Sequence, residues 1–195
     1  MIRSKELAGP PLLISAPHRR ADRLTGALTL RLFNELGAAA AAWNSVHRRA
    51  GESNCEGTTD LARLRRNPFT AFSLAFAAAY PKGRVVQIHG FDPDRRVSTA
   101  GRNADLILSS GSETATPAVR AIARCVRDDL PDWQVAVFPN DVRELGARKN
   151  AQGRQLRATG FHGFVHVELA YHFRVQLMEN EELRGRFGNC LEAGL

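Results

Sequence analysis

The segment "LLISAPHRRADRLTG" (12–26) joins an apolar run to a histidine and then to a segment with a helical pattern. The run 11–18 is short and lacks a helical period, which is typical of a buried strand, whereas 23–37 has apolar residues every three or four positions and ends at a glycine. A strand that leads directly into a helix is the repeating unit of an α/β fold. The segment also raises a chemical question, because His18 lies where the apolar strand ends.

The same alternation of strand and helix continues along the chain. Further strands are predicted at 39–46, 84–89, 104–111, 133–139 and 163–169, and further helices at 67–80, 116–130 and 179–194. Turn-forming residues predict loops at 51–60 and 140–162. The pattern therefore predicts an α/β fold with a mostly parallel or mixed central sheet and helices on both faces, in which ligand sites lie at the carboxyl ends of the strands.

Length and composition predict one domain over 1–195, because 44% of the residues are hydrophobic and no linker divides the chain. No run approaches the roughly 18 apolar residues of a membrane helix, and the first residues lack a secretory signal pattern, so we expect a soluble cytoplasmic protein with no membrane partner. The three cysteines are far apart and form no CxxC motif, which predicts reduced thiols.

The chain is basic, with 27 Lys and Arg against 20 Asp and Glu and a formal charge of +7. The basic residues occur in short scattered groups without interleaved aromatic residues, whereas a nucleic-acid-binding module concentrates them on one surface. Such residues are commonly solvated, and some can bind an anionic substrate. Nucleic-acid binding is therefore kept only as a minor hypothesis.

Three of the predicted strands end at ionisable residues: His18, His89 and Glu168. Singly, a histidine after a strand is more often a surface or hydrogen-bonded residue than a metal ligand, but three such ends in one sheet would converge on one edge. With Asp22 they supply two imidazoles and a carboxylate, the ligand set of a hydrolytic zinc site, and leave Glu168 as a base. Asp22 also suits the N-cap of the following helix. His166 should share the sheet face of Glu168, and a structural role is favoured for it.

The motifs "PHRRAD" with Thr25, "DLARL", "VVQIHGF" and "VHVELAYHFR" follow one another in the order that is found in zinc carboxypeptidase-like hydrolases. From about residue 12 to 174 the chain resembles N-formylglutamate amidohydrolases and phage poly-γ-glutamate hydrolases in particular. The resemblance implies Zn²⁺ ligands at His18, Asp22 and His89 and a general base and acid at Glu168. The chain departs from the H-x-x-E pair of related branches, because Asp22 lies one residue beyond the position of that glutamate.

Three arginines are candidates for binding a carboxylate of the substrate. "DLAR" resembles the D-L-N-R motif of the aspartoacylase branch, and this resemblance implies that Arg63 holds a substrate carboxylate. Ala62 stands in place of the asparagine, and a solvated helix face is the alternative for Arg63. Arg174 resembles an arginine that follows the catalytic glutamate in these families, and a structural ion pair is its alternative. Arg48 is the third candidate.

The predicted function is that of a zinc-dependent amidohydrolase. It would cleave the amide bond of an N-acyl, for example N-formyl, or γ-linked acidic amino acid, so its partner is a small molecule or short peptide that carries a carboxylate. The alternative enzyme is a poly-γ-glutamate hydrolase or peptidase of the same layout. The alternative from another class is a non-catalytic domain that binds anions or nucleic acid.

Overall fold

The central sheet of the computed structural model, which describes residues 1–2, 10–50 and 59–195, has six strands in the order β2-β1-β3-β6-β4-β5. The strands are β1 (Leu12–Ala16), β2 (Ala40–Trp43), β3 (Arg84–Phe91), β4 (Leu106–Ser109), β5 (Val135–Val137) and β6 (Phe164–Ala170). All neighbouring strands are parallel except β4 and β6, which pair antiparallel. The prediction of a single α/β domain with a mixed sheet is therefore confirmed.

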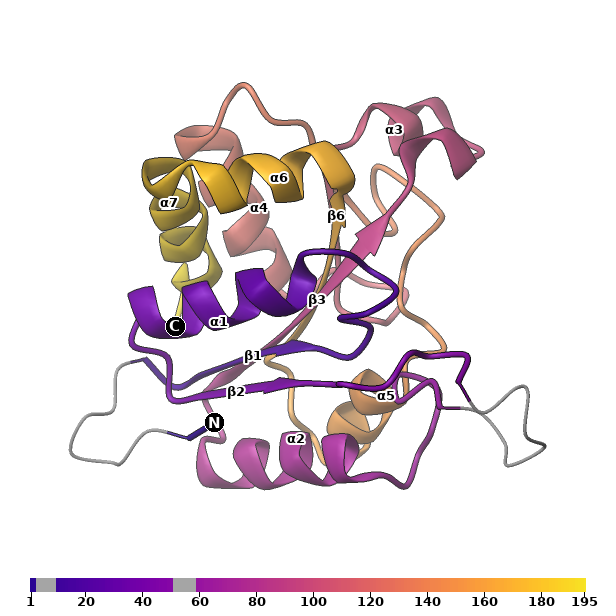
Figure 1. The fold of residues 1–195 in the computed structure, drawn as a ribbon, viewed down its shortest axis with the longest axis vertical. Coiled ribbons are helices and arrows are strands. Elements are labelled where there is room, and N and C mark those ends of the chain that lie inside the picture. The colour runs from indigo at the N-terminus through magenta and orange to yellow at the C-terminus, as the bar shows by residue number, and fades with distance from the viewer. Residues whose placement is uncertain (3–9, 51–58) are drawn as a thin grey trace.

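Helices cover both faces of this sheet, as predicted (Figure 1). One face is covered by α1 (Thr25–Glu35), α4 (Pro117–Asp129), α6 (Tyr171–Glu179) and α7 (Glu181–Glu192), and the other by α2 (Pro68–Ala79) and α5 (Ala151–Ala158). The connection from β3 to β4 contains the short helices η2 (Pro93–Arg95) and α3 (Thr99–Asn103). In the described part of the chain, none of the helices combines the length and apolar character that a membrane crossing requires.

The side-chain alternation of β3 explains where polar residues collect. Val86 and Ile88 point into the larger apolar core, under α1 and its neighbours. On the opposite face Val85 packs in the smaller core against α2, and the next two side chains on that face are those of Gln87 and His89. This face therefore changes from apolar to polar toward the carboxyl end of the strand, where a site can form.

Two helical segments differ from the sequence expectation. The predicted loop 140–162 contains α5, which begins after Asn150, whose side chain accepts a hydrogen bond from Gly153 N. Gly153 lets the helix lie close to the sheet, because a Cβ atom there would come within 2.6 Å of the Phe164 ring. The terminal helix predicted at 179–194 is confirmed as α7, which Asn180 caps, but it is preceded by α6 in a stretch for which no helix was predicted. Most of the predicted loop 51–60 lies outside the described residues.

A disulfide joins Cys125 on α4 to Cys190 on α7, so the prediction of reduced thiols is wrong for these two residues. They are 65 residues apart in sequence, but α4 and α7 pack against the same face of the sheet and bring their Cα atoms within 5.4 Å. A sequence pattern cannot reveal a pairing that depends on the packing of two helices. Cys55 lies outside the described residues.

Candidate active site

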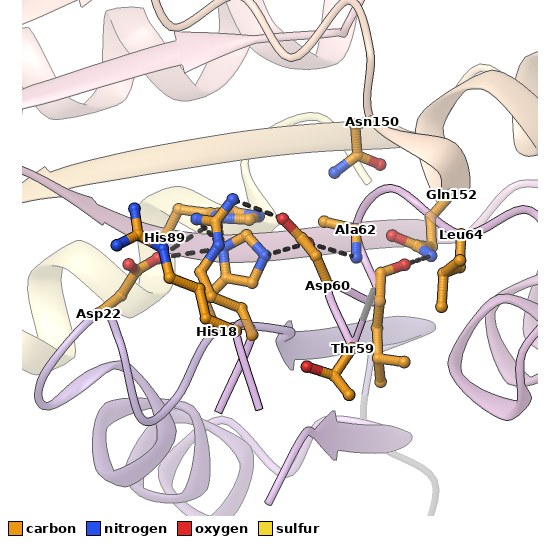
Figure 2. A network of polar contacts seen from close by, with 12 residues as sticks. His18, Asp22, Thr59, Asp60, Ala62, Leu64, His89, Asn150 and Gln152 are labelled. Carbon is orange, nitrogen blue, oxygen red and sulfur yellow. Dashed lines mark hydrogen bonds and ion pairs between the residues drawn. The ribbon is translucent and has the colours of Figure 1, made fainter. Parts of the chain in front are cut away.

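The three predicted ligand residues converge beyond the end of β1 and at the carboxyl-terminal part of β3 (Figure 2). Asp22 Oδ2 lies 3.5 Å from His18 Nδ1 and 3.5 Å from His89 Nδ1, and the two Nδ1 atoms are 3.1 Å apart. A turn after β1, closed by a 2.7 Å hydrogen bond from Asp22 N to His18 O, brings the carboxylate back beside the imidazole. Asp22 Oδ2 also accepts a hydrogen bond from Gly90 N, which ties this turn to β3.

Asp22 does not cap α1, so the alternative interpretation of this residue is wrong. The N-cap of the helix is Leu24, which makes no side-chain cap hydrogen bond. Only the main chain of Asp22 contributes there, since its carbonyl accepts a hydrogen bond from Thr25 Oγ1. The carboxylate is thus available to the histidines.

Each histidine has an oxygen acceptor at its other ring nitrogen. His18 Nε2 lies 2.7 Å from Asp60 Oδ1, and His89 Nε2 lies 2.9 Å from Gln87 Oε1. These oxygens favour the tautomers with protons on Nε2, which leaves both Nδ1 lone pairs facing the carboxylate of Asp22. Three acceptor atoms that face one point repel one another unless a cation or a proton lies between them.

The spacing of these three atoms fits a tetrahedral metal ion. Zinc bound to nitrogen and oxygen at its usual distances places neighbouring ligand atoms about 3.4 Å apart. The three separations here are 3.1, 3.5 and 3.5 Å. The chemistry and the geometry of His18, Asp22 and His89 therefore both suit Zn²⁺.

The electrostatics of the cluster favour the protonation states that a metal requires at His89 and Asp22, but not at His18. Burial lowers the pKa of His89 to about 4, so this imidazole is neutral near pH 7. Burial opposes ionisation of Asp22, but its contacts with the two histidines hold the pKa well below its ordinary value. Burial likewise opposes protonation of His18, but the carboxylates of Asp22 and Asp60 raise its pKa. His18 is thus the group that would lose its proton on metal binding.

Asp60 was not among the predicted site residues, although it is part of the "DLARL" motif. Burial opposes its ionisation, yet contacts with His18 and Arg48 lower its pKa to about 2. Arg48 Nη2 donates to Asp60 Oδ2 at 2.5 Å, and its Nη1 lies 3.2 Å from His18 Nδ1. A histidine that binds a metal usually donates its other ring N–H to an oxygen acceptor. A search of the sequence for a carboxylate that could accept from His18 could therefore have suggested Asp60.

A buried network of side-chain amides holds the partner of His89 in place. Gln87 Oε1 also accepts from Asn150, and Gln87 Nε2 donates to Gln152 Oε1 at 3.2 Å. Gln152 Nε2 in turn donates to Thr70 Oγ1 at 2.7 Å. These contacts fix the orientation of Gln87, and so of the His89 ring, from α5 and α2. Sequence reasoning missed them because the region of α5 was expected to be a loop.

Glu168 lies beside the cluster because β3 and β6 pair in register, with His89 opposite Glu168. Its side chain is buried, its Oε1 lies 3.5 Å from His166 Nε2, and its Oε2 has no hydrogen-bond partner among the described residues. Burial, and then the charge of Asp22, raise the pKa of Glu168 to about 8. A carboxyl group with this environment can carry a proton near neutral pH.

His166 also belongs to the wall of the site. Its ring lies 4.5 Å from that of His89 between centroids, and burial lowers its pKa well below the ordinary value. Its Nδ1 has no hydrogen-bond partner among the described residues. The sequence favoured a structural role for His166, and the structure shows that it also lines the cleft.

All three candidate arginines line the same cleft but differ in their contacts. Arg63 is exposed, whereas Arg174 is buried and packs under Gly90, where a Cβ atom would lie 2.5 Å from its Cζ. Arg174 donates to the main-chain oxygens of Arg23 and Ala170 and forms no ion pair with a described carboxylate, so the alternative of a structural ion pair is not observed. Arg48 contacts Asp60, as described above.

The cleft has a volume of about 790 Å³, with the histidines, Asp22 and Glu168 in its lining. Most of its other charged side chains are basic. Among the described lining residues they are Arg23, Arg48, Arg63, Arg95, Arg96, Arg143, Arg148, Lys149 and Arg174, against a single further acid, Asp92. Such a lining attracts anionic ligands.

No known family model matches the chain, and no curated protein matches it in sequence. Among solved structures, the fold is similar to that of an N-formylglutamate amidohydrolase from Ralstonia eutropha JMP134, with a TM-score of 0.55. The match covers 95% of this chain and 91% of that chain, with 13% sequence identity. At this identity the comparison shows a shared fold over nearly the whole chain.

Proposed function

We propose that the protein is a zinc-dependent amidohydrolase that cleaves the amide bond of an N-acyl, for example N-formyl, or γ-linked acidic amino acid. The observation that carries the proposal is the set of three acceptor atoms of His18, Asp22 and His89 that face one point beside Glu168. The basic lining of the cleft and the fold shared with an N-formylglutamate amidohydrolase support the choice of reaction and substrate.

Within this proposal, His18, Asp22 and His89 hold the metal, and Asp60 and Gln87 keep the imidazole protons on Nε2. A zinc ion bound there would polarise the amide carbonyl and lower the pKa of water toward about 7. Because burial keeps His89 neutral near pH 7, this ligand is available without the loss of a proton.

Glu168 is assigned the proton transfers. Its Oε2 atom would accept a proton from the attacking water and later donate it to the departing amine nitrogen, so that the carboxylate is restored at the end of the cycle. A carboxyl group whose pKa lies near 8 is suited to both steps, since neither protonation state is strongly disfavoured. No described residue forms a hydrogen bond with Oε2, which leaves this atom available to the reacting groups.

For the substrate carboxylate, Arg63 is the first choice among the three arginines. It is exposed at the cleft and forms no ion pair among the described residues, whereas Arg48 is bound to Asp60. Arg174 donates to main-chain oxygens and lies against Gly90, so it would contact the substrate carboxylate from that side of the cleft. A planar guanidinium can bind a carboxylate with two parallel hydrogen bonds.

The test is hydrolysis of N-formylglutamate and of γ-glutamyl oligomers by the wild type and by Glu168→Gln. The proposal expects cleavage by the zinc-loaded wild type and a turnover lower by roughly two to four orders of magnitude in the variant, with zinc retained. Release of oligomers instead of single amino acids would favour the poly-γ-glutamate hydrolase alternative. Wild-type protein that binds no zinc when zinc is supplied, and that cleaves neither substrate, would favour the non-catalytic anion-binding domain.

A further inference from the structure

A second cavity, of about 190 Å³, adjoins the cleft that contains the metal-ligand cluster. Arg63 and Lys149 line both cavities, so the two spaces meet at these side chains. The smaller cavity is also lined by Arg65 and Arg154, and the described residues of its lining include no carboxylate. We call the cavity formed around Arg63, Arg65, Lys149 and Arg154 the basic pocket.

No described acidic side chain neutralises the positive charge of the basic pocket. Among the described residues none of its four basic side chains forms an ion pair, whereas Arg96 in the cleft pairs with Glu144. Burial and the charge of Arg154 lower the pKa of Arg157, which indicates that cations are crowded along this side of α5. Crowded cations repel one another, and an anion that binds among them removes this repulsion.

The turn 60–64 fixes the basic pocket relative to the metal ligands. Asp60 at the start of this turn lies 2.7 Å from His18 Nε2, and Arg63 is in the same turn. Two hydrogen bonds of 2.7 Å from the first residues of α5 hold the turn against that helix, on which Arg154 lies. An anionic group in the basic pocket would therefore lie at a fixed separation from the metal-ligand cluster.

We propose that the basic pocket is a second anion subsite, which binds a carboxylate of the ligand remote from the amide bond at the metal cluster. The proposal rests on the proposed function for the identity of that bond. Arg63, which is shared with the cleft, is assigned above to the carboxylate next to the amide bond, whereas Arg65 and Arg154 line only the smaller cavity and are left for a carboxylate farther along the ligand. The ligand that uses both cavities is an extended chain with several carboxylates, which arginine side chains recognise bidentately.

The test measures binding separately from catalysis. A fluorescein-labelled glutamate oligomer is titrated, by fluorescence anisotropy, into zinc-loaded protein that carries Glu168→Gln to slow cleavage. The same titration is made after adding Arg65→Gln and Arg154→Gln, and after adding Arg124→Gln, which removes an exposed arginine of α4 that lines neither cavity. We expect the Kd to rise about tenfold with the paired substitution and to stay unchanged with Arg124→Gln.

Equal affinity of the paired variant and its parent would overturn the subsite. Stronger displacement of the probe by tripolyphosphate or single-stranded DNA than by unlabelled glutamate oligomer would overturn its assignment to a carboxylate chain. Weakened binding in the paired variant, together with no hydrolysis by the wild type, would refute the proposed function and leave the anion site standing. Hydrolysis with unchanged oligomer affinity would refute the subsite alone.

Discussion

The two faces of β3 carry different kinds of side chain at neighbouring positions. On one face Val86 and Ile88 are fully buried in the core beneath α1. On the other face Gln87 and His89 are just as deeply buried but are held by hydrogen bonds to polar side chains. Burial of the first face stabilises the fold because it removes apolar surface from water. Burial of the second face is unfavourable unless its polar groups are hydrogen-bonded. Substitutions on the two faces should therefore affect different properties.

The largest effect is expected when Asp22, the carboxylate of the polar face, becomes Asn. The amide keeps the shape and can still accept from Gly90 N, but it removes the negative charge between the histidines. Zinc affinity should fall by at least about a hundredfold. This is more than is usual when a residue that only hydrogen-bonds to a metal ligand is replaced. Competition with a chromogenic chelator measures it, and Asp92→Asn, at an exposed carboxylate of the same cleft, is the matched control. Equal losses in both variants would remove Asp22 from the ligand set.

Ile88→Ala tests the apolar face directly beside His89. Truncation of this fully buried side chain should lower the free energy of unfolding by about 2–4 kcal/mol. Zinc content and turnover per folded molecule should stay close to those of the wild type, because the side chain points away from the site. Chemical denaturation and metal analysis of the same preparation measure both. Loss of zinc from fully folded Ile88→Ala would show that the two faces are not separable.

Asp60→Asn tests the second layer of the polar face. The amide keeps a hydrogen-bond acceptor near His18 Nε2 but loses the charge that orients and polarises the imidazole. Zinc affinity should fall about ten- to hundredfold, less than for Asp22→Asn. A loss as large as that of Asp22→Asn would make Asp60 a ligand instead of a positioning residue.

The smallest effect is expected for the pH dependence of stability of Glu168→Gln, compared with the wild type in excess chelator so that no metal is bound. The pKa of Glu168 is raised from 4.5 to about 8 in the folded protein, so its contribution to stability is fully present below pH 4.5 and is lost as the pH rises toward 8. Glu168→Gln does not lose stability in this way, because glutamine has no carboxyl group to ionise. The melting temperature of the variant minus that of the wild type should therefore increase by a few degrees between pH 5 and pH 8. A difference that does not change with pH would show that Glu168 is ionised without penalty.

The comparison of the two faces also explains what the sequence could and could not predict. Strand ends at His18, His89 and Glu168 are local patterns, and the parallel order of β1, β3 and β6 brings them together. Asp60 reaches His18 across 42 residues, through a turn that no periodicity marks. The α5 sequence "AQGRQLRA" has few apolar residues, and its burial depends on a glycine that fits against Phe164.

The most direct test of the account is the zinc content of purified wild-type protein and of His18→Ala and His89→Ala, measured after dialysis against trace zinc. The account predicts one zinc ion per chain in the wild type, and affinity weakened by orders of magnitude in each variant, with circular dichroism showing that the variants remain folded. Stoichiometric zinc in both variants, or none in the wild type at micromolar zinc, would contradict it.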